Sequence, residues 1–129
     1  MDASRLRDIC LGFPGTYEDF PFGPETSVFK VRASGTSAGK MFAASAMDPD
    51  NWYVSLKCDP ALAEQLRAAH PEINGAWHMN KTHWNGVRLD GALPDAMVRD
   101  MVEDSYDLVV SSLTRKQQEQ LGWARLAKG

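Results

Sequence analysis

The chain has 129 residues, 43% of them hydrophobic, and a formal net charge of −3. This length and composition are typical of one globular domain whose core needs no disulfide or metal, and they exclude a disordered chain. No apolar run approaches the roughly 20 residues that a membrane-spanning helix needs. The acidic balance also argues against a protein whose whole surface is dedicated to nucleic acid, although a local basic patch remains compatible with it.

The N-terminal residues lack the charged, apolar and small-residue regions of a signal peptide. We therefore expect a cytoplasmic protein. In that reducing compartment the two cysteines, Cys10 and Cys58, are expected to stay unpaired thiols.

The first predicted element is an amphipathic helix that ends at the glycines and proline of residues 12–15. Its apolar residues follow the spacing i, i+3, i+4, i+7, which places them on one helix face. Residues 17–25, rich in proline, glycine and aromatics, suggest a short edge strand and a loop. The expected buried helix face consists of Leu6, Ile9, Cys10 and Phe13.

Three strands are predicted next, over residues 27–33, 40–47 and 52–57, because apolar and polar side chains alternate there. Residues 35–39 and 48–51 are rich in turn-forming residues and separate these strands. Such short connections favour an antiparallel meander.

A second helix is predicted from Asp59, a suitable N-cap, and Pro60, which fits the first helical position. It should stop before Pro71, since the residue preceding a proline avoids helical geometry. The expected buried stripe consists of Leu62, Leu66 and Ala69.

Residues 73–82 are expected to form an irregular connection and residues 83–89 a further strand. A third helix is predicted from Pro94 to about Leu113. Residues 1–113 are then a single domain, and residues 114–129 a polar, partly helical tail. The order helix–strands–helix–strand–helix predicts an α+β fold with an antiparallel sheet and helices packed on one face. The expected inner face of the third helix consists of Met97, Val98, Met101, Val102, Ser105, Leu108, Val109 and Ser112.

No catalytic set is apparent, so we expect a non-enzymatic protein without a metal or cofactor. Residues 35–40 have three residues between the glycines, and a strand follows, so they do not form a phosphate-binding loop. The three histidines lack the short spacing of zinc ligands. Ser105 is interpreted as a small residue at a helix–sheet crossing, with its hydroxyl bonded to a carbonyl one helical turn earlier.

Candidate binding residues gather in residues 77–85, which combine tryptophan, histidine, asparagine and lysine. This mixture suits the binding of a base, a phosphate or a small anion. The alternative is that the tryptophan rings seal the core while the polar groups hydrogen-bond to an irregular backbone. A second group of candidates, all cationic, flanks the first turn. These side chains are expected either to contact phosphates or to protect a sheet edge from aggregation. The candidates are Lys57, His78, Asn80, Lys81, His83 and Trp84 in and near the first group, and Lys30, Arg32 and Lys40 in the second.

Seven short blocks, in order between residues 5 and 113, resemble the MmcQ/YjbR family of small bacterial proteins. The resemblance implies a CyaY-like fold with a double-wing motif, in which β-hairpins reach into DNA. The wings would be the turns at residues 35–39 and 48–51, and DNA would be the partner. The blocks span residues 11–15, 19–23, 28–31, 39–42, 55–60, 78–85 and 105–109.

Two other hypotheses stay open beside DNA binding. One is a small-molecule or anion pocket around Lys57, His78, Lys81 and Trp84. The other is a protein-interaction module that uses an apolar stripe in the tail. That stripe consists of Leu121, Trp123 and Leu126.

Overall fold

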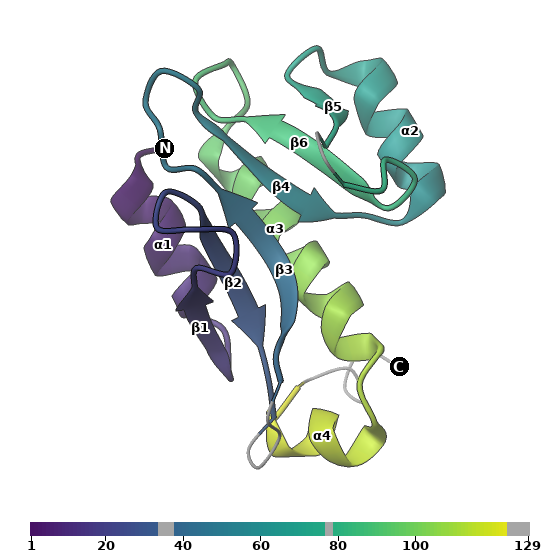
Figure 1. Cartoon of the computed structure of the whole chain (residues 1–129). Coiled ribbons are helices and arrows are strands. Elements are labelled where there is room, and N and C mark those ends of the chain that lie inside the picture. The colour runs from purple at the N-terminus through teal and green to yellow at the C-terminus, as the bar shows by residue number, and fades with distance from the viewer. Residues whose placement is uncertain (34–37, 77–78, 124–129) are drawn as a thin grey trace.

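The computed structural model describes residues 1–33, 38–76 and 79–123. Within these ranges the chain forms four helices and six strands (Figure 1). In chain order they are α1 (Ala3–Leu11), β1 (Thr16–Asp19), β2 (Ser27–Val31), β3 (Lys40–Ser45), β4 (Tyr53–Lys57), α2 (Pro60–Ala69), β5 (Ile73–Gly75), β6 (Trp84–Arg88), α3 (Asp95–Ser111) and α4 (Arg115–Gln120).

The strands form one antiparallel sheet in the order β1-β2-β3-β4-β6-β5. The meander of β1 to β4 confirms the prediction from short connections. β5 was not predicted, because its three residues include a glycine and show no alternation. Its pairing with β6, which sets Ile73 opposite Val87, gives it strand geometry.

The helices α1, α2 and α3 pack on one face of this sheet, as predicted, and Figure 1 shows α3 running behind β3 and β4. The hydrophobic core lies between these layers. The other face has no helix over it in the described part of the chain. Residues fully buried in the core include Leu6, Phe29, Phe42, Val54 and Val102.

The predicted buried stripe of α2 is correct at Leu66, which is half-buried against the core, and wrong at Leu62 and Ala69. Leu62 is 40% exposed and Ala69 is also exposed, whereas Ala63 is buried. The physical reason is that α2 lies over the outer strands β5 and β6, where only a narrow helix face meets the sheet.

The predicted inner face of α3 is correct up to Ser105 and then shifts by one position. Tyr106 and Val110 are buried, whereas Leu108 is half-buried and Ser112 is exposed. The Tyr106 ring stacks on Phe13 with centroids 4.7 Å apart, and its hydroxyl donates to the Pro14 carbonyl at 2.7 Å. These contacts with the segment after α1 bury Tyr106, which the apolar stripe did not include.

Ser105 joins two strands and does not bond within its own helix, so that expectation is wrong. The β3–β4 ladder contains only the pairs Ala43 with Leu56 and Ala44 with Ser55. Where the two strands diverge, the Ser105 hydroxyl donates to the Phe42 carbonyl at 2.5 Å and accepts from the Lys57 N–H at 2.8 Å. The side chain thus satisfies two backbone groups that the ladder leaves free.

The segment after α3 packs against the domain. α4 begins with a capping box at Thr114, and Leu121 is only 8% exposed and belongs to the core cluster. The Trp123 indole donates to Asp107 at 2.7 Å. Leu121 is therefore not available as an exposed anchor, and Leu126 lies outside the described residues.

A candidate ligand groove on the helix-free face

The strand register assigns each side chain to one face of the sheet, because neighbouring residues of a strand point to opposite faces. Val54 and Leu56 of β4 point into the core. The intervening side chains of β4 therefore face away from the helices, and so do their partners on β6. These pairs are Tyr53 with Arg88, Ser55 with Gly86 and Lys57 with Trp84.

A groove of about 380 Å³ lies on this face, above β3 and β4. Its size lies within the range of small-molecule sites in proteins, about 300 to 1,000 Å³. Contributions come from β3, β4, the β1–β2 loop and the turn before β6. The groove is lined by Phe22, Thr26, Met41, Ala44, Ser45, Ala46, Tyr53, Ser55 and Met79.

The groove lining is mostly apolar, with hydroxyls from Thr26 and Ser55. Phe22, in the β1–β2 loop, remains 67% exposed. Two aromatic rings and two thioethers make a surface that suits a flat apolar molecule, since sulfur and aromatic groups adapt to ring faces. The sequence analysis did not name these residues as candidates. For Met41 and Tyr53 the alternation of the predicted strands could have indicated them, because it places both side chains on the face away from the core.

Lys57 lies two residues along β4 from Ser55 and opposite Trp84 on β6, but neither residue lines this groove. Lys57 lines a separate hollow beside α2 and α3, together with Asp104. Its side chain is half-buried. Of the predicted pocket residues, the structure brings Lys57 and Trp84 together.

The turn before β6 is held from α2. Arg67 donates from Nε to the side-chain oxygen Oδ1 of Asn85 at 2.7 Å, and from Nη2 to the backbone carbonyl of Lys81. The Asn80 side chain accepts from the Thr82 N–H at 2.9 Å. Asn80 thus shapes the turn that also carries the groove residue Met79.

Lys81 and His83, two other candidates from this turn, are not among the described groove residues. The Lys81 stem lies against Gly75 of β5, where an added Cβ would be 2.9 Å from Lys81 Cδ. His83 is exposed, and its carbonyl accepts from the Cys58 N–H at 2.8 Å. His78 lies outside the described residues.

The three cations of the first hairpin do not converge. Lys30 and Arg32 share the helix-free face, but Lys30 is paired with Asp19 at 2.8 Å and Arg32 stacks over the Tyr17 ring at 4.6 Å. The hydrogen bond from Lys30 lowers the pKa of Asp19. Lys40 points to the opposite face, where its ammonium donates at 3.2 Å to Ser112, the C-cap residue of α3.

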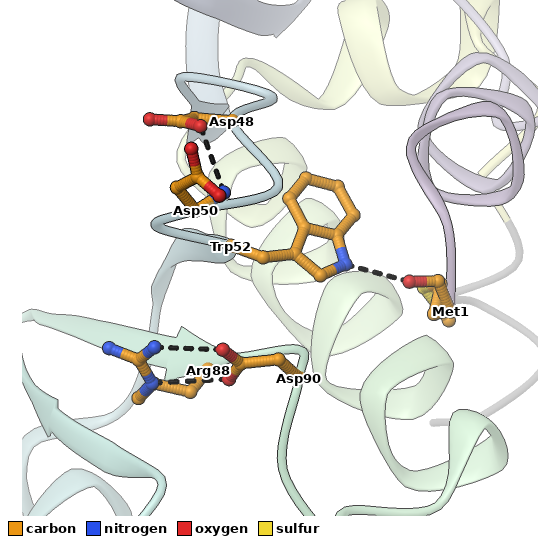
Figure 2. Close-up of polar contacts among 6 residues, drawn as sticks. All are labelled: Met1, Asp48, Asp50, Trp52, Arg88 and Asp90. Carbon is orange, nitrogen blue, oxygen red and sulfur yellow. Dashed lines mark hydrogen bonds and ion pairs between the residues drawn. The ribbon is translucent and has the colours of Figure 1, made fainter.

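The second predicted wing, residues 48–51, is a tight turn with an acidic tip. The Asp50 N–H donates to the Asp48 carboxylate at 2.9 Å (Figure 2). Figure 2 also shows Arg88 paired with Asp90 at 2.9 Å, and this contact lowers the pKa of Asp90. Most of the first wing, residues 34–37, lies outside the described residues.

Residues 1–33, 38–76 and 79–123 contain no group of three or more histidine, cysteine or carboxylate side chains placed to hold a metal ion. Burial raises the pKa of the Cys58 thiol, which disfavours the reactive thiolate. None of the described helices is long and apolar enough to span a bilayer.

The sheet, its one-sided helices and the groove define a small α+β domain with an open sheet face. Residues 11–108 match the YjbR family model, and the chain belongs to the YjbR family. The uncharacterized protein YbdF of Escherichia coli O157:H7 is 34% identical over 125 residues, covering 94% of this chain and 98% of YbdF. The uncharacterized protein YjbR of Escherichia coli strain K12 is 32% identical over 121 residues, covering 94% of this chain and 98% of YjbR.

Solved structures agree with this assignment. The crystal structure of Deinococcus radiodurans protein DR2400 has a TM-score of 0.86 at 37% identity, covering 94% of this chain and 88% of that one. A crystal structure from Pseudomonas syringae has a TM-score of 0.67 at 27% identity, covering 84% of this chain and 99% of that one.

Proposed function

We propose that this protein is a non-enzymatic binding domain whose groove on the helix-free face takes a small molecule with a flat apolar body. The observation that carries the proposal is the groove of about 380 Å³, lined by the rings of Phe22 and Tyr53 and the thioethers of Met41 and Met79. A concave apolar site with a few polar groups is the usual form of a small-ligand site.

The exposure of Phe22 supports the same occupant. An apolar side chain that is 67% exposed beside an apolar groove gains buried area when a ligand fills the groove. Burial of apolar area contributes roughly 25 cal/mol per Å². The hydroxyls of Ser55 and Thr26 supply directional contacts.

Duplex DNA stands second among the proposed partners. The matching features are Lys30, Arg32 and Lys57 on the helix-free face. Three observations disfavour DNA. Lys30 is paired with Asp19, Lys40 lies on the other face, and the turn at residues 48–51 is acidic. A carboxylate at a wing tip repels the phosphates that such a wing approaches.

The test is a fluorescence titration with phenylnaphthylamine, an uncharged flat probe that brightens in apolar sites. We expect saturable binding that Ala46→Trp weakens at least about tenfold, because the indole fills the groove. The matched control is Ala61→Trp, at an exposed position of α2. Cooperative thermal unfolding of each variant excludes probe binding to a loosened fold.

Equal binding by Ala46→Trp and the unaltered protein would move the probe out of the groove and contradict the proposal. A labelled duplex is titrated in parallel over a salt series. Duplex binding whose logarithm falls with log salt by about 0.9 per neutralised phosphate, without any probe binding, would put DNA first.

A further inference from the structure

We infer that the ligand of this groove is an uncharged aromatic molecule that presents a hydroxyl or carbonyl oxygen to the side chain of Ser55. Ser55 then distinguishes such a ligand from a purely apolar molecule of the same shape. This inference rests on the proposed function, because it concerns the chemistry inside the same groove.

The Ser55 hydroxyl is nearly buried and has no partner. Ser55 is 4% exposed, lines the groove and lies between two strand residues that point into the core. Within residues 1–33, 38–76 and 79–123 its hydroxyl makes no hydrogen bond. In the same ranges no side-chain oxygen or nitrogen that is shut off from solvent lacks a partner, so this hydroxyl opens into the groove. A nearly buried hydroxyl without a protein partner favours a ligand oxygen that can bond to it.

The other serine of the groove differs in this respect. The Ser45 hydroxyl donates to the Tyr53 carbonyl at 2.6 Å and accepts from the Met47 N–H at 3.1 Å. Its hydrogen bonds therefore serve the connection from β3 to β4. The Ser55 hydroxyl serves no such contact, so it is the one that a ligand can use.

The neighbours of Ser55 leave space above its hydroxyl. The register places Ala44 of β3 and Gly86 of β6 beside it, and neither side chain extends beyond a methyl group. A Cβ added at Gly86 would have Ala76 Cα as its nearest heavy atom, at 3.7 Å, which is an ordinary contact. Packing therefore does not require glycine at this position. The row of small side chains gives a flat ring access to the Ser55 hydroxyl.

The lining of the groove indicates that the ligand is uncharged. The described lining residues include no lysine, arginine, histidine, aspartate or glutamate. An ionised group that left water for this mostly apolar surface would lose its hydration without gaining an opposite charge. A neutral oxygen can instead exchange a hydrogen bond with water for one with Ser55.

The experiment measures displacement of phenylnaphthylamine by 2-naphthol and by 2-methylnaphthalene, which have the same shape and differ in the hydroxyl. We expect Ser55→Ala to weaken 2-naphthol about fivefold, equivalent to about 1 kcal/mol, and to leave 2-methylnaphthalene within about twofold. The matched control is Ser111→Ala, at an exposed hydroxyl of α3 that bonds only to Leu108. It should change neither affinity. On the unaltered protein, 2-naphthoate should bind at least about tenfold more weakly than 2-naphthol.

The outcomes separate this inference from the proposed function. If phenylnaphthylamine binds and Ala46→Trp blocks it, but Ser55→Ala leaves 2-naphthol unchanged, the inference falls and the groove stands. An equal loss of both competitors in a cooperatively unfolding Ser55→Ala protein would also overturn it, since Ser55 would then have a packing role. Binding of 2-naphthoate as tight as that of 2-naphthol would contradict the uncharged ligand. If phenylnaphthylamine does not bind the folded protein, the groove and the inference fail together.

Discussion

The two faces of the sheet differ in how completely their side chains are satisfied. On the helix-covered face Phe42 contacts Phe13 and Tyr106 edge to face, and Ser105 bridges two strands. On the helix-free face the Phe22 ring stays exposed beside the groove. The first face therefore provides most of the stability of the domain, and the second leaves an apolar ring that the proposed ligand would cover.

The largest difference between the two faces is expected at Phe42 and Met41, neighbouring residues of β3 that point to opposite faces of the sheet. Phe42→Ala should destabilise the protein by about 3 to 5 kcal/mol, because it empties a fully buried site. Met41→Ala, on the groove side, should cost about 1 kcal/mol or less, since the side chain is only half-buried. Urea unfolding measures both. Similar losses would contradict the division of roles between the faces.

A smaller effect is expected at the junction of β3 and β4. Ser105→Ala should cost about 1 to 3 kcal/mol, because the Lys57 N–H and the Phe42 carbonyl lose their partner away from water. The matched control is Ser111→Ala on the same helix, where an exposed hydroxyl bonds only to Leu108. A Ser105 variant as stable as its control would show that the diverging strands need no bridge.

The smallest effect concerns pH. Burial raises the pKa of Tyr106 to about 12, above its ordinary value of 10. The stabilising contribution of the neutral phenol is fully present below about pH 10, the unfolded pKa, and is lost as pH rises towards 12. Thermal unfolding midpoints between these limits should therefore fall more steeply for the unaltered protein than for Tyr106→Phe. Parallel curves for the two proteins would exclude Tyr106 as a source of the alkaline loss.

The elements of this fold were largely predictable because local signals define them. Alternation located the three long central strands, and Asp59 with Pro60 located the start of α2. β5 was missed because a three-residue strand depends on its neighbour. The buried face of α2 was partly wrong because apolar periodicity does not report how much of a helix meets a sheet.

The candidate site was predictable only in part. Lys57 and Trp84 were named from composition, and the strand register brings them together. Phe22 and Met79 come from separate loops, so no local pattern joins them to β3 and β4. Asn80 was chosen for its polar side chain, but that side chain completes a turn.

The sequence by itself determined the α+β class, the family and most element positions, since capping, turns and alternation act over a few residues. Only the tertiary structure decided which cations share a face. The β2–β3 register shifts between Phe29 and Lys30, which sets Lys30 opposite Met41 and sends Lys40 to the helix side. A shift of one residue reverses the face of every side chain beyond it, and such a shift is fixed by packing between strands.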